Sequence, residues 1–377
     1  MEKLRVGLLF GGRSVEHDVS LVSARSILAA LDRRRYDVSL IAIDDAGRWH
    51  LADGSRTPAG ALAAPEVFLP ASPTGPRLRA AKASPATSPE AAALETLSQI
   101  DVVFPIVHGR GGEDGSLQGL LELAEVPYVG SGVLSSAVQM DKDVAKRLLN
   151  AAGLPVTPWI SFSAGRLHRE GLPASADRAA AEIGLPVFVK PANSGSSVGI
   201  SRADTHEELV AALALALRYD RKVVVETAVD GREIEVAVLG NDEPRASVAG
   251  EIRAAQAFYD YDAKYRDDST QLIIPADLDA ALMEALRETA IAAYRALDAS
   301  GLARVDFLVE RETGTFMINE LNSLPGFTDV SMYPKLWEAS GLPYPALLDQ
   351  LIELALERHG ERSKLETHGP PPLRGDA

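Results

Sequence analysis

Residues 303–322 read ARVDFLVERETGTFMINELN, and the sequence predicts that they form a β-hairpin turning at Gly314. A three-residue loop with glycine in the left-handed conformation would place Asp306 opposite Glu320. Glu320 and Asn322 are two residues apart, so both side chains point to the same face of their strand. Three oxygen ligands therefore converge without a histidine or cysteine, a set that suits Mg²⁺. An ordinary solvated hairpin face is the competing interpretation.

A second informative stretch is VKPANSGSSVG, residues 189–199. A strand ends in Lys190 and passes into a loop of small residues, whose backbone N–H groups can approach a phosphate closely. The glycine spacing differs from that of a Walker A loop. A plain hairpin loop is the alternative, but a lysine buried at a strand end needs an anionic partner. We therefore expect a phosphate site here.

The N-terminal part alternates strands with a helix, which indicates a mostly parallel sheet. The expected strands are Leu4–Phe10, Val38–Ile43 and Asp101–Val107, and the expected helix is Ser20–Leu31. Glycine-rich loops follow two of these strands, at residues 11–17 and 108–115. Ligands bind at such carboxyl ends in open α/β sheets, but the dinucleotide motif G-x-G-x-x-G is missing. For His17 and His108 we favour structural hydrogen bonds over metal binding.

The remaining chain divides into further segments. Residues 52–98 are rich in Ala, Pro, Ser and Gly, which predicts a peripheral insertion or irregular loop with one helix near Ala91–Leu97. One helix carrying Lys142 is expected over Val133–Ala152. Later segments are expected as strands Pro186–Lys190, Val198–Arg202, Lys222–Thr227, Glu233–Leu239 and Arg245–Ile252, helices Glu207–Leu217, Leu278–Leu297 and Tyr344–Arg358, and a functional loop, Gln256–Gln271.

These segments predict domains at residues 1–130, 131–225 and 226–360, followed by a disordered tail, 361–377.

Composition restricts the function further. The 38 basic and 53 acidic residues give a net charge of −15, which disfavours a nucleic-acid partner. No apolar run reaches membrane-spanning length, no signal peptide is recognisable, and the chain has no cysteine. We expect a cytoplasmic protein without disulfides or thiol chemistry.

Eight ordered motifs together resemble the D-alanine–D-alanine ligases, a family with the ATP-grasp fold. The motifs are FGGRSVEH (10–17), HGRGGEDG (108–115), MDK (140–142), VKP (189–191), GSSVG (195–199), FYDYDAKY (258–265), RVD (304–306) and NELNSLPG (319–326). The resemblance covers residues 3 to 355. It implies an α/β chain, α+β in parts, with an N-terminal open parallel α/β domain and two ATP-grasp subdomains.

The resemblance also implies a reaction for peptidoglycan precursor synthesis. ATP phosphorylates the carboxylate of one D-alanine, and the amine of a second D-alanine displaces the phosphate through a tetrahedral intermediate. The implied cofactors are ATP, two Mg²⁺ ions replaceable by Mn²⁺, and a monovalent cation. The implied partners are D-alanine, ATP and a second copy of the chain in a homodimer, with neither nucleic acid nor membrane.

Residue roles follow from the same resemblance. ATP contacts are implied for Lys142, Lys190, Ser197, Glu226, Glu233, Lys264 and Asn319, and Mg²⁺ ligands for Asp306, Glu320 and Asn322. The implied catalytic group is Glu16, Ser196, Tyr265, Arg304, Gly326 and Ser331. Within it, Arg304 and the Gly326 N–H would stabilise the oxyanion, and Glu16 would hold the first ammonium group. Ser331 would receive the second carboxylate, and Glu16, Ser196 and Tyr265 would form a hydrogen-bonded triad.

Two alternatives stay open. One is that the chain is an ATP-grasp ligase with a different acceptor, such as D-lactate or D-serine. The other is that it is a nucleotide-binding regulator without catalysis. Tyr265 favours the dipeptide product, because the ester-forming relatives generally depart from the Lys-Tyr loop pattern. Arg304 argues against a regulator, since a binding protein has no need for an oxyanion donor. Asn193-Ser194 and Ser323-Leu324 depart mildly from the commoner family pattern, which leaves exact loop contacts open.

Overall fold

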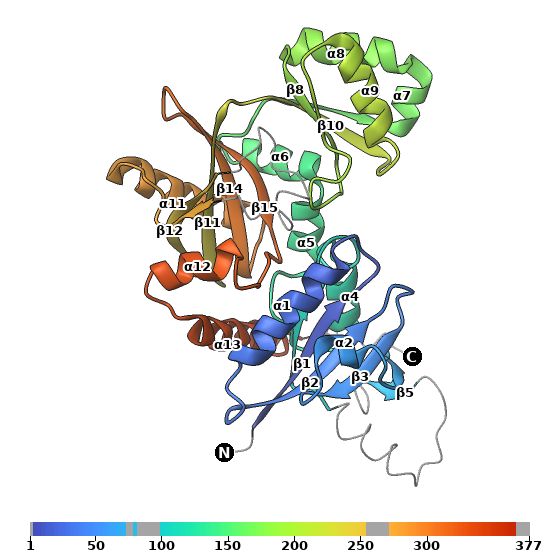
Figure 1. Ribbon diagram of the computed structural model, residues 1–377, viewed down its shortest axis with the longest axis vertical. Helices are drawn as coiled ribbons and strands as arrows, with labels where there is room; N and C mark the ends of the chain where they lie inside the picture. Colours follow the sequence, from blue (N-terminus) through green and yellow to red (C-terminus); the bar gives the residue numbers. More distant parts are fainter. Residues whose placement is uncertain (1–2, 73–77, 81–98, 254–270, 367–377) are drawn as a thin grey trace, which may run out of the picture.

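The computed structural model describes residues 3–72, 78–80, 99–253 and 271–366. Three sheets organise these residues into an N-terminal, a central and a C-terminal part (Figure 1). None of the helices in those ranges combines the length and apolar character needed to span a bilayer. The mixed α/β class predicted from the sequence is confirmed, while the predicted domain limits remain predictions.

The N-terminal sheet has the strand order β5-β4-β3-β2-β1-β6. β1 pairs in parallel with β2 and with β6, as the alternating pattern predicts. Antiparallel β3, β4 and β5 extend the sheet beyond β2. The elements are β1 (Leu4–Gly11), α1 (His17–Ala30), β2 (Tyr36–Ile43), β3 (Trp49–Asp53), α2 (Pro58–Ala61), β4 (Glu66–Phe68), β5 (Arg79–Ala80), β6 (Val102–Ile106) and α4 (Ser116–Leu123).

The segment expected as irregular, 52–98, is therefore partly regular. Its strands are two or three residues long, and such short strands leave no alternating pattern to recognise. The helix expected near Ala91–Leu97 lies outside the described residues, as does most of the loop expected at 256–271. The predicted tail begins inside α13, which runs to Arg362, and residues 367–377 are again outside the description.

The prediction of a single helix over Val133–Ala152 is wrong, because the structure contains two helices, α5 (Val133–Met140) and α6 (Lys142–Ala151). Asp141 separates them in an extended conformation, and its carboxylate accepts a hydrogen bond from the Val144 N–H at 3.1 Å. An aspartate that caps a new helix competes with continuation of the old one. Lys142 consequently begins a helix, and its N–H donates to the Ala192 carbonyl at 3.0 Å.

The central part is a four-stranded sheet in the order β7-β10-β8-β9. Its core is separate from the other cores and includes Val189, Leu209 and Val225, all without solvent exposure. The strand β7 was not expected from the sequence. The elements are β7 (Trp159–Ser163), α7 (Ala164–Glu170), α8 (Leu172–Ile183), β8 (Val187–Pro191), β9 (Ser201–Ala203), α9 (His206–Ala216) and β10 (Lys222–Thr227).

The C-terminal sheet, in the order β13-β12-β11-β14-β15, contains the hairpin at 303–322. Asp306 lies opposite Glu320 as predicted, but the loop is longer than the predicted three residues. The Glu310 N–H donates to the Thr315 carbonyl at 2.8 Å across four intervening residues. A register shift beside Asp306 then restores the predicted pair. The elements are β11 (Gly231–Gly240), β12 (Arg245–Arg253), β13 (Gln271–Ile273), α11 (Ala280–Ala296), β14 (Gly301–Glu310), β15 (Phe316–Asn322), α12 (Met332–Ala339) and α13 (Tyr344–Arg362).

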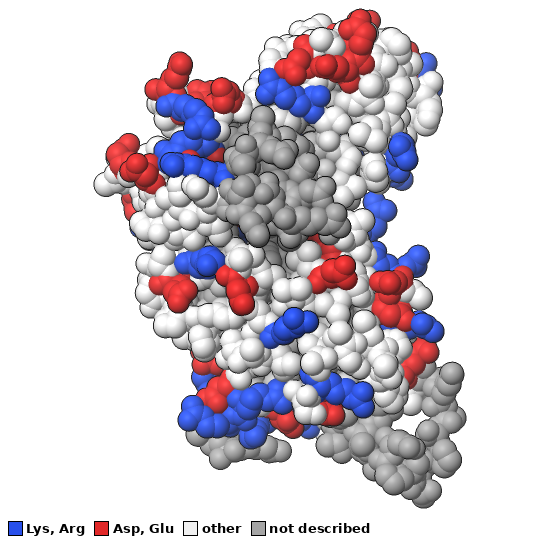
Figure 2. All heavy atoms as spheres, viewed as in Figure 1, with Lys and Arg blue, Asp and Glu red and all other residues white. Residues whose placement is uncertain are grey.

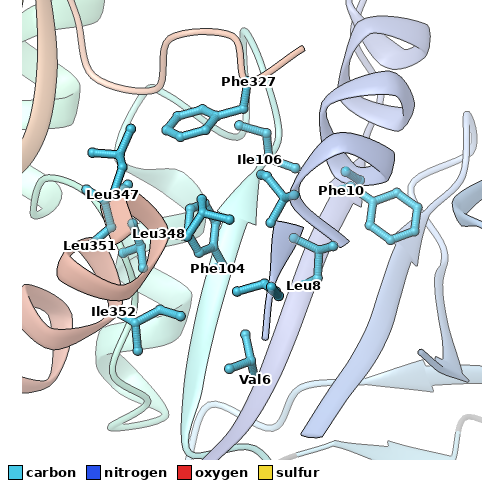
Figure 3. Packing of buried hydrophobic residues seen from close by; sticks show 14 of the residues in the cluster. Val6, Leu8, Phe10, Phe104, Ile106, Phe327, Leu347, Leu348, Leu351 and Ile352 are labelled. Atoms are coloured by element: carbon cyan, nitrogen blue, oxygen red, sulfur yellow. The ribbon is translucent and has the colours of Figure 1, made fainter. Parts of the chain in front are cut away.

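One hydrophobic core is shared by the N-terminal and C-terminal parts (Figure 3), and each of the two parts also has a core of its own. Side chains of α13 such as Leu348 and Leu351 pack toward strands β1 and β6. Phe327, just after the C-terminal sheet, meets Phe104 of β6 edge to face with ring centroids 6.0 Å apart. This continuous core fixes the loops of the two parts against each other at the edge of the site.

Candidate active site

One cavity lies where loops of all three parts meet. It collects nine of the residues predicted for the site: Glu16, Lys142, Ser196, Ser197, Arg304, Glu320, Asn322, Gly326 and Ser331. Lys264 and Tyr265 lie outside the described residues. Figure 2 shows acidic and basic side chains interspersed over the visible face, so the net charge of −15 is not gathered into one patch there.

Glu16 and Ser196 join the N-terminal part to the central part. The Ser196 hydroxyl donates a hydrogen bond to the Glu16 carboxylate, which is 7% exposed. Ser196 and Ser197 both have positive φ, 48° and 57°, a conformation that costs energy for residues other than glycine. Two members of the predicted triad are therefore in contact, and their loop is held in a strained shape at the site.

The buried Lys190 bridges the central and C-terminal sheets. Its Nζ donates to Glu226 Oε2 at 2.9 Å and to Asn319 Oδ1 at 3.1 Å. Burial opposes the charge of Lys190, but Glu226 more than offsets that effect and raises the lysine pKa. Glu233 adds to this rise in pKa from β11. Four residues predicted to contact ATP, three of them charged, thus interact at the junction of two sheets.

The bulge in the C-terminal hairpin explains why the neighbouring residues Asn319 and Glu320 contact two different lysines. Asp306 pairs with Glu320 and Phe307 with Ile318, so Asn319 is the extra residue on its strand. A bulge re-aims side chains that strict alternation would send to opposite faces. Asn319 meets Lys190, while Glu320 Oε2 lies 3.3 Å from Lys142 Nζ.

Arg304 is the second cation of the site, with 18% of its side chain exposed. Its Nε and Nη2 donate to the two Asp306 oxygens at 2.7 Å each, and its Nε lies 3.0 Å from Glu235 Oε2. Burial would lower the pKa of Arg304, but Asp306 and then Glu235 raise it well above its usual range. Asn322 Nδ2 donates to Asp306 Oδ2 at 2.9 Å. The guanidinium is held by two carboxylates at the wall of the cavity.

The predicted Mg²⁺ ligands converge as expected. Asp306 and Glu320 are a cross-strand pair, and Asn322 contacts Asp306. Two carboxylates and an amide supply the oxygen donors that Mg²⁺ prefers, and both carboxylates already attract cationic side chains. Across the described residues, no cluster of three or more His, Cys, Asp or Glu side chains forms a metal site. The donor set fits an ion that takes only a few protein ligands.

Gly326 and Ser331 also line the cavity. A Cβ on Gly326 would lie 2.7 Å from Ser331 Oγ, so glycine permits the close approach. Ser331 Oγ accepts a hydrogen bond from the Thr328 N–H at 2.9 Å and lies 2.8 Å from the Thr328 hydroxyl. The hydroxyl is thereby oriented close to the Gly326 backbone.

The two histidines hold loops in place. His17 Nδ1 lies 3.0 Å from the Gly12 carbonyl, and His108 Nδ1 lies 3.1 Å from the Leu324 carbonyl. The hydrogen bonds confirm the structural role expected for both side chains. His108 also ties the N-terminal sheet to the loop that precedes Gly326.

Three charged residues at or beside the site were not predicted from the sequence: Glu113, Glu235 and Lys146. Glu113 lines the cavity, and burial, with Glu16 nearby, raises its pKa to about 8. Glu235 shares the face of Glu233, two residues earlier on one strand, and this spacing was a usable signal. Lys146 is four residues after Lys142, so both belong to one face of α6. The four-residue spacing from Lys142 gives no reason to expect that the charge of Lys146 is buried.

Comparison with known proteins places the chain in a family. The family model "D-ala D-ala ligase N-terminus" matches residues 5–131, and "D-ala D-ala ligase C-terminus" matches residues 148–353. The chain is 51% identical to a D-alanine–D-alanine ligase of Shouchella clausii, with 97% of each chain covered. It is 48% identical to D-alanine–D-alanine ligase A of Escherichia coli K12, covering 97% of this chain and 100% of the relative.

Solved structures agree with these matches. The D-alanine–D-alanine ligase of Coxiella burnetii superposes with a TM-score of 0.81 at 38% identity, covering 96% of this chain and 98% of that one. The VanG D-Ala:D-Ser ligase of Enterococcus faecalis gives a TM-score of 0.80 at 33% identity, covering 94% and 100%. This enzyme chain has the ATP-grasp fold and belongs to the D-alanine–D-alanine ligase family.

Proposed function

We propose that this chain joins two D-alanine molecules in an ATP-dependent reaction that passes through an acyl phosphate. The observation that carries the proposal is the single cavity in which Glu16, Arg304 and Ser331 come together from distant parts of the chain. A carboxylate, a guanidinium and a hydroxyl are the groups needed to hold an ammonium, a developing oxyanion and a carboxylate. Family membership supports the same reaction.

Lys142 and Lys190 suit a triphosphate. Lys142 and Lys190 each keep donor capacity beyond their protein partners, because an ammonium has three hydrogens. Lys142 Nζ donates to the Ser194 carbonyl at 2.9 Å, and Lys190 donates to Glu226 and Asn319. Under this proposal both lysines bind ATP phosphates, Ser197 adds a contact from its loop, and Lys264 adds a further charge. Glu226 and Glu233 receive the adenosine end.

The reaction at the substrate carbonyl carbon depends on hydrogen-bond donors and charges that the folded protein already holds in position. Arg304 and the Gly326 N–H stabilise the tetrahedral oxyanion as the second amine attacks, and phosphate leaves. Glu16 holds the first ammonium and, with Ser196 and Tyr265, closes the triad. Ser331 binds the second carboxylate. Such preorganised donors act most strongly where water is excluded.

Asp306, Glu320 and Asn322 would hold two Mg²⁺ ions, replaceable by Mn²⁺, which would supply charge neutralisation for the phosphates. The proposal includes a monovalent cation as activator. It also includes the three domains at 1–130, 131–225 and 226–360, a homodimer, a cytoplasmic location and a role in peptidoglycan precursor synthesis. The last three are supported by family membership.

The test is phosphate release by the purified protein with ATP, Mg²⁺ and D-alanine. We expect one phosphate per dipeptide formed and no release with L-alanine. Release that depends on D-lactate or D-serine as the second substrate would identify a different acceptor, although the higher identity to D-alanine–D-alanine ligases does not favour this. No release with any of these substrates would contradict the proposal.

A further inference from the structure

Lys146 is a buried cation without a role in the reaction described above. It lies on α6, 2% exposed, in the same helical row as Lys142 but one turn further along. Its Nζ donates to Thr157 Oγ1 at 2.6 Å and lies 3.7 Å from Glu226 Oε2. Burial lowers the pKa of Lys146 to about 8, despite the opposing effect of Glu226. A charge kept at this desolvation cost calls for an explanation beyond packing.

The two oxygens of the Glu226 carboxylate have different surroundings. Oε2 accepts from Lys190 at 2.9 Å and lies within 3.5 Å of the Thr157 hydroxyl and 3.7 Å of Lys146. Oε1 is buried and has no hydrogen-bond partner among the residues that the structure describes. One oxygen is therefore anchored by cations on two sides, and the other is a free acceptor in a closed environment.

The two lysines also determine the charge state of the carboxylate. Burial would raise the pKa of Glu226, but Lys146 and then Lys190 overcome this effect and hold the pKa below its usual value. Lys190 is shared with Asn319, whereas Lys146 directs its ammonium group to Thr157 and Glu226. Lys190 makes the direct hydrogen bond to Glu226, and Lys146 adds a second positive charge on the Thr157 side of the same carboxylate oxygen.

A carboxylate oxygen that is ionised and held in a fixed orientation can distinguish two ligands that differ only in the group placed against it. An amino group donates to it, whereas a carbonyl oxygen in the same place is repelled and leaves the carboxylate unpaired. Adenine has an amino group at position 6, and hypoxanthine has a carbonyl there. This step rests on the proposed function, in which Glu226 receives the adenosine end of ATP.

We propose that Lys146 is a positioning residue for nucleobase selection: it anchors Glu226 Oε2 so that Oε1 accepts from the 6-amino group of adenine. Lys146 acts through Thr157 and Glu226 and does not itself touch the nucleotide. The position of α6 between the central and C-terminal sheets (Figure 1) suits such a role, since one helix supports both the phosphate and the base ends.

Calorimetric titration with ADP and IDP in the presence of Mg²⁺ tests the proposal without D-alanine. Lys146→Met keeps the length of the side chain and leaves the Lys190–Glu226 pair intact, so the variant should fold. We expect its affinity for ADP to fall about tenfold and its affinity for IDP to change little, so that the preference for ADP largely disappears. Thr157→Val removes only the bridging hydroxyl and should shift the preference in the same direction by a smaller factor.

Arg147→Met is the matched control, because Arg147 is next on α6 with 63% of its side chain exposed and pairs with Asp143. It should keep the wild-type ratio of affinities. An unchanged ratio in Lys146→Met would overturn the proposal, and if that variant is unfolded, an unchanged ratio in Thr157→Val does so. Failure of the proposed ligase reaction would appear separately, as wild-type protein that binds ADP but releases no phosphate with D-alanine.

Discussion

Arg304 is a mostly enclosed guanidinium, 18% exposed, that is shared by two carboxylates, Glu235 and Asp306. Removing it would leave both acids without their common cation, a change that costs about 3–5 kcal/mol in buried pairs. We expect Arg304→Met to lower the melting temperature, whereas Arg304→Lys should retain more stability because the charge remains. Both should reduce kcat by about 10²–10³-fold, since lysine lacks the planar fork.

Melting curves and phosphate release measure these two effects separately. The stability loss of Arg304→Met should shrink when Glu235→Gln is added, because one unpaired carboxylate is then removed. A wild-type kcat in a folded Arg304→Lys variant would argue against the oxyanion role.

We expect Glu113 to make the stability of the protein dependent on pH. Burial, together with repulsion from Glu16, raises its pKa from 4.5 to about 8. A folded-state pKa above the unfolded value means that the folded state holds the extra proton. The stabilisation is fully present below pH 4.5 and is lost as pH rises through 8, amounting to at most about 5 kcal/mol.

Glu113→Gln should therefore flatten this dependence, because the amide stays neutral throughout. Urea unfolding at pH 5 and pH 8.5 measures the effect, and the variant should exceed the wild type in stability only at the higher pH. Glu182→Gln, with 53% of its side chain exposed, is the matched control and should leave the dependence intact. Equal pH dependence in wild type and Glu113→Gln would refute the explanation.

At the scale of elements, the turn after β1 determines where Glu16 lies. Gly11 has φ +90°, and a Cβ there would lie 2.1 Å from the Ile43 carbonyl oxygen, a backbone atom that cannot move aside cheaply. Gly111 has nearly the same φ, +89°, and a Cβ at that position would meet open space. Comparing alanine substitutions at Gly11 and Gly111 therefore separates the effect of steric collision from that of backbone strain.

We expect Gly111→Ala to cost about 1–2 kcal/mol from the left-handed conformation alone. Gly11→Ala should cost clearly more, and it should also displace the loop that carries Glu16. Chemical denaturation measures the first effect, and the KM for D-alanine measures the second. Equal losses in the two variants would show that the contact with Ile43 relaxes without difficulty.

Elements that depend on local pattern could be predicted, and those that depend on distant contacts could not. The hairpin at 303–322 was expected from its alternating residues and Gly314, and the pairing of Asp306 with Glu320 is confirmed. Its bulge was missed because an extra residue leaves no local signal. The break at Asp141 was missed for a related reason: apolar spacing continues across it, while the cap that begins the next helix is a single side chain.

The site shows the same division. Motif residues such as Lys190 were expected at a phosphate site, and its burial is confirmed. Lys146 and Glu235 were missed, because their significance arises from partners more than 60 residues away, such as Glu226 and Arg304. Lys146 pairs from helix α6 with strand β10, and Glu235 pairs from β11 with the neighbouring strand β14. Charge pairing between elements so far apart in sequence is a property of tertiary structure, and no spacing along the chain reports it.

For the whole molecule, the separation of cores predicts how the chain unfolds. The N-terminal and C-terminal parts share a core, whereas the central part has its own around Leu209 and Val225. Its links to the rest are largely polar, including the hydrogen bonds from Ser196 to Glu16 and from Lys190 to Asn319. Cores without apolar continuity need not unfold together.

We therefore expect scanning calorimetry of the ligand-free protein to show two transitions, and the central part to give one of them. Leu209→Ala should lower that transition selectively, with a loss of about 2–5 kcal/mol, and Leu348→Ala in the shared core should lower the other by a similar amount. ATP with Mg²⁺ is proposed to bridge the central and C-terminal sheets. At 100 times its Kd it should add about 2.7 kcal/mol to the central part and draw the transitions together. A single transition that responds equally to both leucine variants, with and without nucleotide, would show that the polar links alone make the three parts one cooperative unit.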